Sequence, residues 1–297
     1  MMIYKIKSNE IEVGIDSVGA QLSSLKDNDG TEYIWQKNPD VWAKSAPVLF
    51  PVVGRSRGGV LEIEGKDYNM PIHGFIQGRE MPVYKAEENE IVFLLEQNES
   101  TKEFYPYDFK FYITFRVEAK KLIVTYRVEN KDNRVMYFGI GGHPGFSTML
   151  EDGDKYEDYR IEFEYDEPLY SNLANTVPDV EICSDEKYLV EKQGNTISLS
   201  RDLFKTDALV FEDIKSKILW LKSNKHNKGI KFSFKDYPTI AIWSKGPGYD
   251  GATYVCFEPW QSMGYRTGEG RRIEDKFQIA NLQPGDVKEY TYEVEVL

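Results

Sequence analysis

Apolar and polar residues alternate strictly along several stretches of this 297-residue chain, and this pattern constrains its fold more than any other feature. Every second residue is apolar in residues 109–117 and again in residues 122–128. A period of two places apolar side chains on one face of a β-strand, so these two segments predict a β-hairpin. The same alternation recurs in five shorter segments: residues 11–15, 91–95, 218–221, 230–234 and 290–296.

Turn-forming groups of Gly, Asn, Asp and Pro separate these segments at short intervals. Only residues 38–44 and 200–204 have a pattern that suits a turn or two of helix. Aromatic residues, which favour strands, make up 14% of the chain, and no linker or low-complexity tract divides it. We therefore predict one all-β domain over residues 1–297, a large and mostly antiparallel sandwich with less than about 10% helix.

The charge distribution excludes two kinds of partner. The formal net charge is −12, and Lys and Arg are dispersed among acidic residues without a basic stripe, so we expect no nucleic-acid partner. The longest apolar stretch, residues 46–53, contains two prolines and is far shorter than the roughly 20 residues of a spanning helix, so we expect no membrane association. Residues 1–7 mix charged and apolar side chains and so do not resemble a signal peptide. We therefore expect the protein in the cytoplasm.

The cysteines give no sign of a disulfide or metal framework. Cys183 and Cys256 form no CxxC motif, and the chain has only three histidines. We therefore expect no zinc site built from His and Cys ligands.

Two of the three histidines lie in tight motifs bracketed by glycine. His73 is the centre of PIHGF, and His143 lies in GGHPGF. Histidine has an ordinary pKa close to neutrality, so two such motifs in one chain favour proton transfer at an active site. The alternative is that each is a buried, hydrogen-bonded histidine at a turn. His226 has only polar turn formers around it, and we expect it to be exposed in a loop.

A carboxylate and an arginine complete the candidate chemistry. Glu258 lies in the apolar segment VCFEPW, where burial should raise its pKa towards that of a general base. The alternative for Glu258 is an ion pair at a strand end. Arg55 follows an apolar run at the start of a glycine-rich loop and offers a fork of donors for sugar oxygens. Asp207 precedes an apolar strand, and by itself such an acid is most often a turn residue.

The order of these motifs resembles the aldose 1-epimerase (galactose mutarotase) family, and more narrowly the branch containing the LacX protein of lactose operons. The resemblance extends over nearly the whole chain, from Gly19 to Gly285. The motifs that carry it, in order, are Gly54-Arg55, His73-Gly74-Phe75, GGHPGF at residues 141–146, Asp207-Ala208-Leu209 and Phe257-Glu258-Pro259-Trp260.

The resemblance implies a β-supersandwich and an active site that needs neither cofactor nor metal. It implies that Glu258 is the catalytic base, His143 the general acid and His73 a second active-site histidine. It also implies sugar binding by Arg55 and Asp207, with Arg57 as the alternative arginine. Two aromatic residues, each close in sequence to an expected catalytic residue, are expected to shape the pocket: Trp260 and Phe146.

Several functions fit these residues. The expected one is mutarotation, the interconversion of the α and β anomers of a hexose by a monomer or homodimer. A non-catalytic sugar-binding protein would use the same residues without proton transfer. A glycoside hydrolase would pair Asp207 with Glu258 and leave the histidines idle. A hexose-6-phosphate mutarotase would need further cations at the rim, for which Arg57 and Arg79 are candidates, although the acidic net charge disfavours a phosphorylated ligand.

Overall fold

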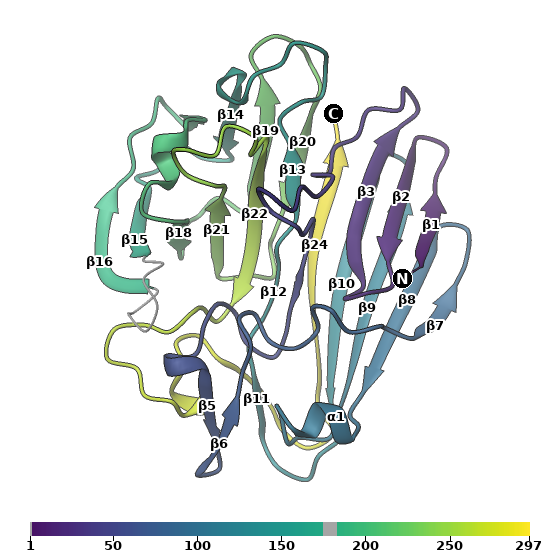
Figure 1. Ribbon diagram of the computed structural model, residues 1–297, viewed down its shortest axis with the longest axis vertical. Coiled ribbons are helices and arrows are strands. Elements are labelled where there is room, and N and C mark those ends of the chain that lie inside the picture. The colour runs from purple at the N-terminus through teal and green to yellow at the C-terminus, as the bar shows by residue number, and fades with distance from the viewer. Residues whose placement is uncertain (1, 175–182) are drawn as a thin grey trace.

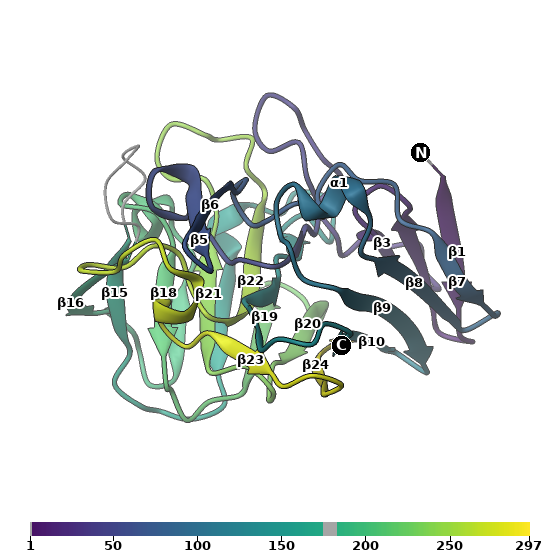
Figure 2. The same ribbon diagram turned by 90° about the horizontal axis from the view of Figure 1, so that it is seen from below.

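The computed structural model describes residues 2–174 and 183–297. Strands account for 48% and helices for 6%, which confirms the all-β prediction. The strands form two large antiparallel sheets and three small ones. Figure 1 shows the hairpin of β5 (Val60–Ile63) and β6 (Lys66–Asn69) at one end of the molecule, and Figure 2 shows the strands from that end.

The larger sheet contains the predicted hairpin. Its two long strands pair without a break from Lys121 opposite Glu118 to Asn130 opposite Phe109. The other alternating segments at residues 91–95, 218–221, 230–234 and 290–296 are strands of the same sheet. In spatial order its strands are β17 (Thr196–Ser198), β14 (Tyr159–Phe163), β19 (Ile218–Ser223), β20 (Gly229–Ser233), β24 (Val287–Val296), β10 (Lys121–Asn130), β9 (Phe109–Glu118), β8 (Glu90–Glu96) and β7 (Val83–Ala86).

The second large sheet has eight strands and carries three of the motifs singled out in the sequence. One of the eight, the short strand β13 (Gly145–Ser147), pairs with β22 (Tyr254–Gln261) beyond the end of β12 (Ile140–Gly142). In spatial order the other strands are β16 (Cys183–Leu189), β15 (Tyr170–Ala174), β18 (Leu209–Glu212), β21 (Thr239–Trp243), β22 (Tyr254–Gln261), β12 (Ile140–Gly142) and β4 (Val48–Leu49).

The remaining elements are short. A three-stranded sheet comprises β1 (Ile3–Lys7), β2 (Ile11–Asp16) and β3 (Gln21–Asp27), and Figure 1 shows it beside β8–β10. Two further strand pairs are β5 (Val60–Ile63) with β6 (Lys66–Asn69), and β11 (Met136–Phe138) with β23 (Ala280–Leu282). The helical segments are α1 (Glu99–Lys102) and the 3-10 turns η1 (Arg57–Gly59), η2 (Tyr156–Asp158), η3 (Arg201–Phe204) and η4 (Ile273–Asp275).

The two candidate helical segments have different outcomes. Residues 200–204 form the 3-10 turn η3. Residues 38–44 form no helix, because Asn38 and Trp42 pair as a β-bridge around a tight turn. Within the described residues, no helix is long and apolar enough to cross a membrane.

The eight-stranded sheet is buried on both faces, and this determines where the site lies. One face packs in the main core, which contains Val255 and Phe257 of β22 together with side chains of the nine-stranded sheet. The other face carries two smaller apolar clusters that include Cys256 and Trp260 of the same strand. Successive strand residues point to opposite faces, so Glu258 lies with Cys256 and Trp260 on this second face. Long loops cover that face and enclose a pocket.

Candidate active site

Strand pairing brings the two most distant motifs together. Gly141 on β12 lies opposite Trp260 on β22, and Gly145 on β13 lies opposite Cys256. Both pairs follow the same register, so the intervening His143 falls opposite Glu258. The ladder is interrupted between β12 and β13 at His143 and Pro144, which leaves the imidazole free to turn into the pocket. An antiparallel register therefore fixes the position of this pair.

The pocket on this face has a volume of about 460 Å³, which suits a single small ligand. It is lined by residues from strands β21 and β22 and from the loops over the face. The structure brings together six of the residues singled out in the sequence: Arg55, His73, His143, Asp207, Glu258 and Trp260. The other lining residues are Trp42, Lys44, Pro47, Gly54, Ile72, Ala208, Trp243, Lys245 and Gly264.

His143 and Glu258 form a buried pair. The Nε2 atom of His143 lies 3.2 Å from Oε1 of Glu258, and the two residues are 8% and 2% exposed. Burial lowers the pKa of His143 well below its ordinary value of 6.5, and the neighbouring His73 adds to this shift. Burial also raises the pKa of Glu258 well above 4.5, and the charge of Asp207 raises it further. Both shifts favour a pair that holds one proton between the two groups.

His73 has a fixed tautomer. Its Nδ1 atom accepts a hydrogen bond from the backbone N–H of Gly54 at 3.1 Å. Burial lowers its pKa to about 3, with help from the positive charges of Lys44 and Arg55. The ring is therefore neutral near pH 7, and its proton is on Nε2. His73 is a hydrogen-bond donor, because a group with so low a pKa is a poor proton acceptor at neutral pH.

The backbone around His73 is constrained by close contacts. His73 has a φ of 64°, in the left-handed region that non-glycine residues rarely adopt. At the next position, Gly74, a Cβ atom would lie only 1.9 Å from the carbonyl oxygen of Phe50. Only glycine fits there, which explains the Gly of the PIHGF motif. Such strain at a pocket residue is typical of a functional site.

Asp207 and Arg55 lie at the wall of the pocket. Burial raises the pKa of Asp207 above its ordinary 3.8, an effect partly offset by the positive charges of Arg55 and Lys245. Of the two candidate arginines, position favours Arg55, because Arg55 lines the pocket and Arg57 does not. The guanidinium of Arg57 instead lies 5.6 Å from the centre of the Tyr265 ring. Arg79, the other candidate rim cation, donates to Ser100 Oγ at 2.8 Å and is likewise outside the pocket lining.

Four lining residues were not found by sequence reasoning. The indole of Trp42 stacks on the His143 ring with centroids 5.1 Å apart, and the Trp243 ring meets the same imidazole edge-on at 5.6 Å. Lys44 and Lys245 also line the pocket. In a chain with many aromatics and lysines nothing local marks these four. The Trp-x-Lys spacing that Trp42 and Trp243 share does not mark them either, because Trp35 and Trp220 are also followed by a lysine two residues later.

The prediction that Phe146 shapes the pocket is wrong. Phe146 is 1% exposed, and its ring packs on Phe232 and Phe257 in the main core. The reason is the alternation of a strand. Phe146 lies opposite Val255, whose side chain faces the core, whereas the neighbouring Gly145 lies opposite Cys256 on the pocket face.

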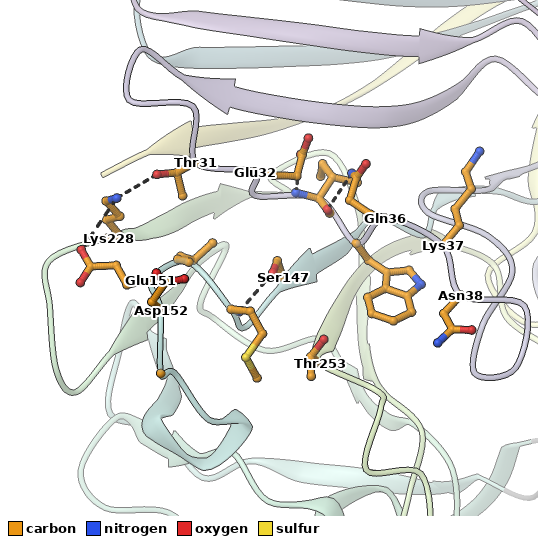
Figure 3. Close-up of a pocket in the computed structure, with 15 residues that line it drawn as sticks. Thr31, Glu32, Gln36, Lys37, Asn38, Ser147, Glu151, Asp152, Lys228 and Thr253 are labelled. Atoms are coloured by element: carbon orange, nitrogen blue, oxygen red, sulfur yellow. Dashed lines mark hydrogen bonds and ion pairs between the residues drawn. The ribbon is translucent and has the colours of Figure 1, made fainter.

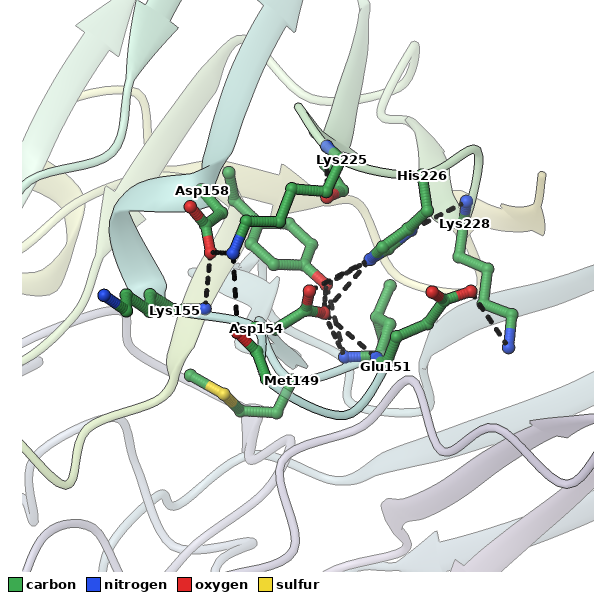
Figure 4. Close-up of polar contacts among 12 residues, drawn as sticks. Met149, Glu151, Asp154, Lys155, Asp158, Lys225, His226 and Lys228 are labelled. Carbon is green, nitrogen blue, oxygen red and sulfur yellow. Dashed lines mark hydrogen bonds and ion pairs between the residues drawn. The ribbon is translucent and has the colours of Figure 1, made fainter.

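His226 lies in a loop as predicted, but the prediction that it is exposed is wrong. Its side chain is 10% exposed, and its Nε2 atom lies 3.1 Å from Oδ2 of Asp154. Asp154 also accepts hydrogen bonds from the hydroxyl of Tyr159 and from the backbone N–H of Glu151 (Figure 4). The polar residues next to His226 in sequence are exposed, but its ring turns inward to satisfy a buried carboxylate. His226 therefore anchors one loop to another, away from the pocket.

A second and larger hollow, of about 960 Å³, lies beside this anchor (Figure 3). Its lining includes Glu32, Glu151 and Lys228, and Lys228 donates a hydrogen bond to Thr31 at 2.8 Å. Its described lining residues include no histidine and no buried acid–base pair. We therefore assign the chemistry to the smaller pocket.

One group near the pocket has the spacing of metal ligands. The ligand atoms of His143, Cys256 and Glu258 lie within 4.8 Å of one another. Burial raises the pKa of the Cys256 thiol well above its ordinary 9.0, and the negative charge of Glu258 adds to this shift. Zinc binds the thiolate form, which this environment disfavours. The donor set therefore suits proton transfer better than metal binding.

Comparisons with known proteins give the family to which this all-β fold and its pocket belong. The model of the Aldose 1-epimerase family matches residues 2–263, and the chain belongs to this family. The chromosomal LacX protein of Lactococcus lactis subsp. lactis is 29% identical over the full length of both chains.

Solved structures agree with this assignment. A galactose mutarotase related enzyme from Lactobacillus acidophilus is 31% identical, with a TM-score of 0.92 over 100% of this chain and 97% of that one. A galactose mutarotase-like protein from Lactobacillus casei is 26% identical, with a TM-score of 0.89 over 100% of both chains.

Proposed function

We propose that this protein is a mutarotase that interconverts the α and β anomers of an aldose. The observation that carries the proposal is the buried His143–Glu258 pair, with 3.2 Å between Nε2 and Oε1, in a pocket of sugar size. Ring opening needs a base at the C1 hydroxyl and an acid at the ring oxygen. It needs no redox partner and no group acceptor, so these side chains supply the chemistry.

The proposed proton transfers balance within the pair. Glu258 takes the proton of the C1 hydroxyl while His143 gives a proton to the ring oxygen, and the bond between C1 and that oxygen breaks. The products are the open-chain aldehyde, a protonated Glu258 and a neutral His143. After rotation about the C1–C2 bond, the ring closes on the other face and both protons return. No net proton is gained or lost.

Burial lowers the energy of the neutral pair relative to the ionised pair. Before ring opening the pair is ionised, and the attraction between carboxylate and imidazolium stabilises that form. After ring opening both groups are neutral, which the buried surroundings favour because charged groups lose their hydration there. The opposite pKa shifts of the two residues support this account, since each shift favours the neutral form.

The other residues are proposed to bind and orient the sugar. The Nε2–H of His73 is suited to donate to a ring or hydroxyl oxygen, since Gly54 occupies Nδ1. Arg55 can donate to hydroxyl oxygens, and Asp207 can accept from hydroxyl groups. Trp42 and Trp243 form an apolar wall around His143, on which the C–H face of a sugar ring can pack.

Two competing functions account for less of the site. A glycoside hydrolase would use two carboxylates and would leave the contact between His143 and Glu258 without a role. A sugar-binding module would have no use for a base with a raised pKa. Mutarotation uses both features.

An anomerisation assay tests the proposal. Freshly dissolved α-D-glucose and α-D-galactose should reach anomeric equilibrium faster with the protein than in buffer alone, as followed by polarimetry. Release of nitrophenol from aryl glycosides should not exceed the buffer rate. Sugar binding without faster equilibration would favour the binding module, and release of nitrophenol would favour the hydrolase.

A further inference from the structure

Three cations line the candidate active site, and none is used by the proton transfers. Lys44, Arg55 and Lys245 all contribute to the pocket lining. Among the described residues, none of the three has a carboxylate within ion-pair distance. Lys44 donates to the neutral side chain of Gln77, and the Lys245 Nζ lies 4.7 Å from the centre of the Tyr249 ring. Neither contact cancels a positive charge.

This arrangement contrasts with the rest of the molecule. The chain has 49 acidic residues against 37 Lys and Arg, so carboxylates are abundant. Close to the same sheet, Glu212 pairs with both Lys187 at 2.7 Å and Arg266 at 3.0 Å. Three cations without such partners around one pocket are therefore unexpected on an acidic protein, and they attract an anion that is not part of the chain.

Each of the three cations acts electrostatically on residues of the pocket. Lys44 acts on both His73 and His143, and Lys245 acts on Asp207. Arg55 acts on both His73 and Asp207. The pocket lining has two carboxylates against these three cations. Glu258 is buried, whereas Asp207 is half-buried and is influenced by the charges of Arg55 and Lys245.

We infer that the substrate is an aldose with an anionic substituent, a phosphate ester or a carboxylate, that is attracted by the positive charges of Lys44, Arg55 and Lys245 in the pocket lining. The inference rests on the proposed mutarotase function and adds the class of substrate. Lysine is a mobile point charge that binds phosphate and carboxylate oxygens well, and charge-assisted hydrogen bonds are the stronger ones. The rim cations expected from the sequence, Arg57 and Arg79, have no part in it, since neither lines the pocket.

The test compares neutral and anionic sugars in pairs. Anomerisation rates would be measured for D-glucose and D-galactose, for their 6-phosphates and for the corresponding uronic acids. We expect kcat/KM to be at least about tenfold higher for one anionic series than for the neutral sugars, and to fall as salt is added. Preference for the 6-phosphates or for the uronic acids then identifies the anion.

Substitutions locate the anion site. Lys44→Gln and Lys245→Gln should each lower the anionic-to-neutral ratio of kcat/KM by about tenfold, and the double variant by more. Lys120→Gln, the same change in the exposed turn between β9 and β10, should leave the ratio unaltered. A ratio that stays the same in the double variant would overturn the assignment of these lysines.

The outcomes separate this inference from the proposed function. If neutral sugars are anomerised best, the inference is overturned while the function stands. If no sugar is anomerised, the function is overturned. In that case calorimetric titration with glucose 6-phosphate and glucuronate decides the inference: binding that the double variant abolishes supports it, and no binding of either anion overturns it.

Discussion

Burial shifts the proton affinities of the histidine and the glutamate of the pocket in opposite directions. With their ordinary pKa values of 6.5 and 4.5, the imidazole would be protonated and the carboxyl group ionised between these two pH values. Burial raises the pKa of the carboxyl group and lowers that of the imidazole, so the ionised and neutral forms of the pair approach each other in energy. Easy proton exchange is the consequence, and it is the property that ring opening requires.

His143→Asn should lower kcat by about 10²-fold or more, because asparagine can hydrogen-bond the ring oxygen but cannot protonate it. KM should change much less, since the shape of the pocket is kept. His226→Asn makes the same replacement outside the pocket, and its activity per folded molecule should match that of the wild type. Steady-state anomerisation kinetics check both variants. A normal kcat in His143→Asn would remove His143 from the mechanism.

The pH profile of kcat/KM should be bell-shaped and broad. The active pair holds one proton, so activity falls when the pair binds a second proton in acid and when it loses its only proton in alkali. The lowered pKa of His143 moves the acid limb below pH 6.5, and the raised pKa of Glu258 moves the alkaline limb well above pH 4.5. His73 has a pKa of about 3 and contributes no limb near neutrality. An activity that rises through pH 6.5 with the titration of one ordinary histidine would contradict this account.

At the level of single residues, the sequence predicted those that lie in distinctive motifs. His73 and His143 stand out because histidine is rare here and glycine flanks both. Trp42 and Lys245 could not be predicted in this way, because one aromatic or one lysine resembles any other until the fold brings it near the imidazole. Phe146 was assigned to the pocket because it is close to His143 in sequence. In a strand, however, successive side chains point to opposite faces, so closeness in sequence does not place two residues on the same face.

At the level of elements, the site depends on strand register. Period-two alternation predicted the β9–β10 hairpin because both strands are long and each has one solvated face. The alternation did not predict a partner strand for β22. This strand is buried on both faces, so its apolar and polar residues do not alternate. The contact between His143 and Glu258 comes from pairings of β22 with β12 and β13, which are distant in sequence, and only the fold supplies them.

Gly145 on β13 should be essential to the position of the His143 imidazole. A Cβ atom at Gly145 would lie 2.8 Å from Cζ3 of Trp42, which stacks on His143. Gly145→Ala should therefore displace the indole, reduce kcat/KM by about tenfold and cost about 1–3 kcal/mol of unfolding free energy through overpacking. Gly270→Ala is the matched control, because no atom lies within 4 Å of a Cβ there. Equal behaviour of the two variants in kinetics and urea unfolding would show that Gly145 has no positioning role.

At the level of the whole molecule, one core joins the beginning and the end of the chain. The main cluster contains Ile6 of β1, Val296 of β24 and side chains of both large sheets. We propose on this ground that the chain folds as one domain, as the absence of any linker in the sequence predicts. The core supports the pocket, because β22 has Val255 and Phe257 in the core and Glu258 and Trp260 in the pocket lining.

Phe146→Ala tests this division between core and site. Removing the ring leaves a cavity between Phe232 and Phe257, and the expected loss is about 3–5 kcal/mol of unfolding free energy. KM for the sugar should stay close to the wild-type value at temperatures where the variant is folded. Chemical denaturation and kinetics measure the two effects separately. A large rise in KM with normal stability would show that Phe146 contacts the sugar in the pocket.

The most direct test of the mechanism is the anomerisation rate of Glu258→Gln. Glutamine keeps the shape of the side chain but cannot accept the proton of the C1 hydroxyl. The account predicts that kcat falls by about 10²-fold or more while the sugar still binds, whereas Glu118→Gln on the exposed hairpin changes neither. Turnover by Glu258→Gln at the wild-type rate would contradict the proposed mechanism even though the fold and family stand.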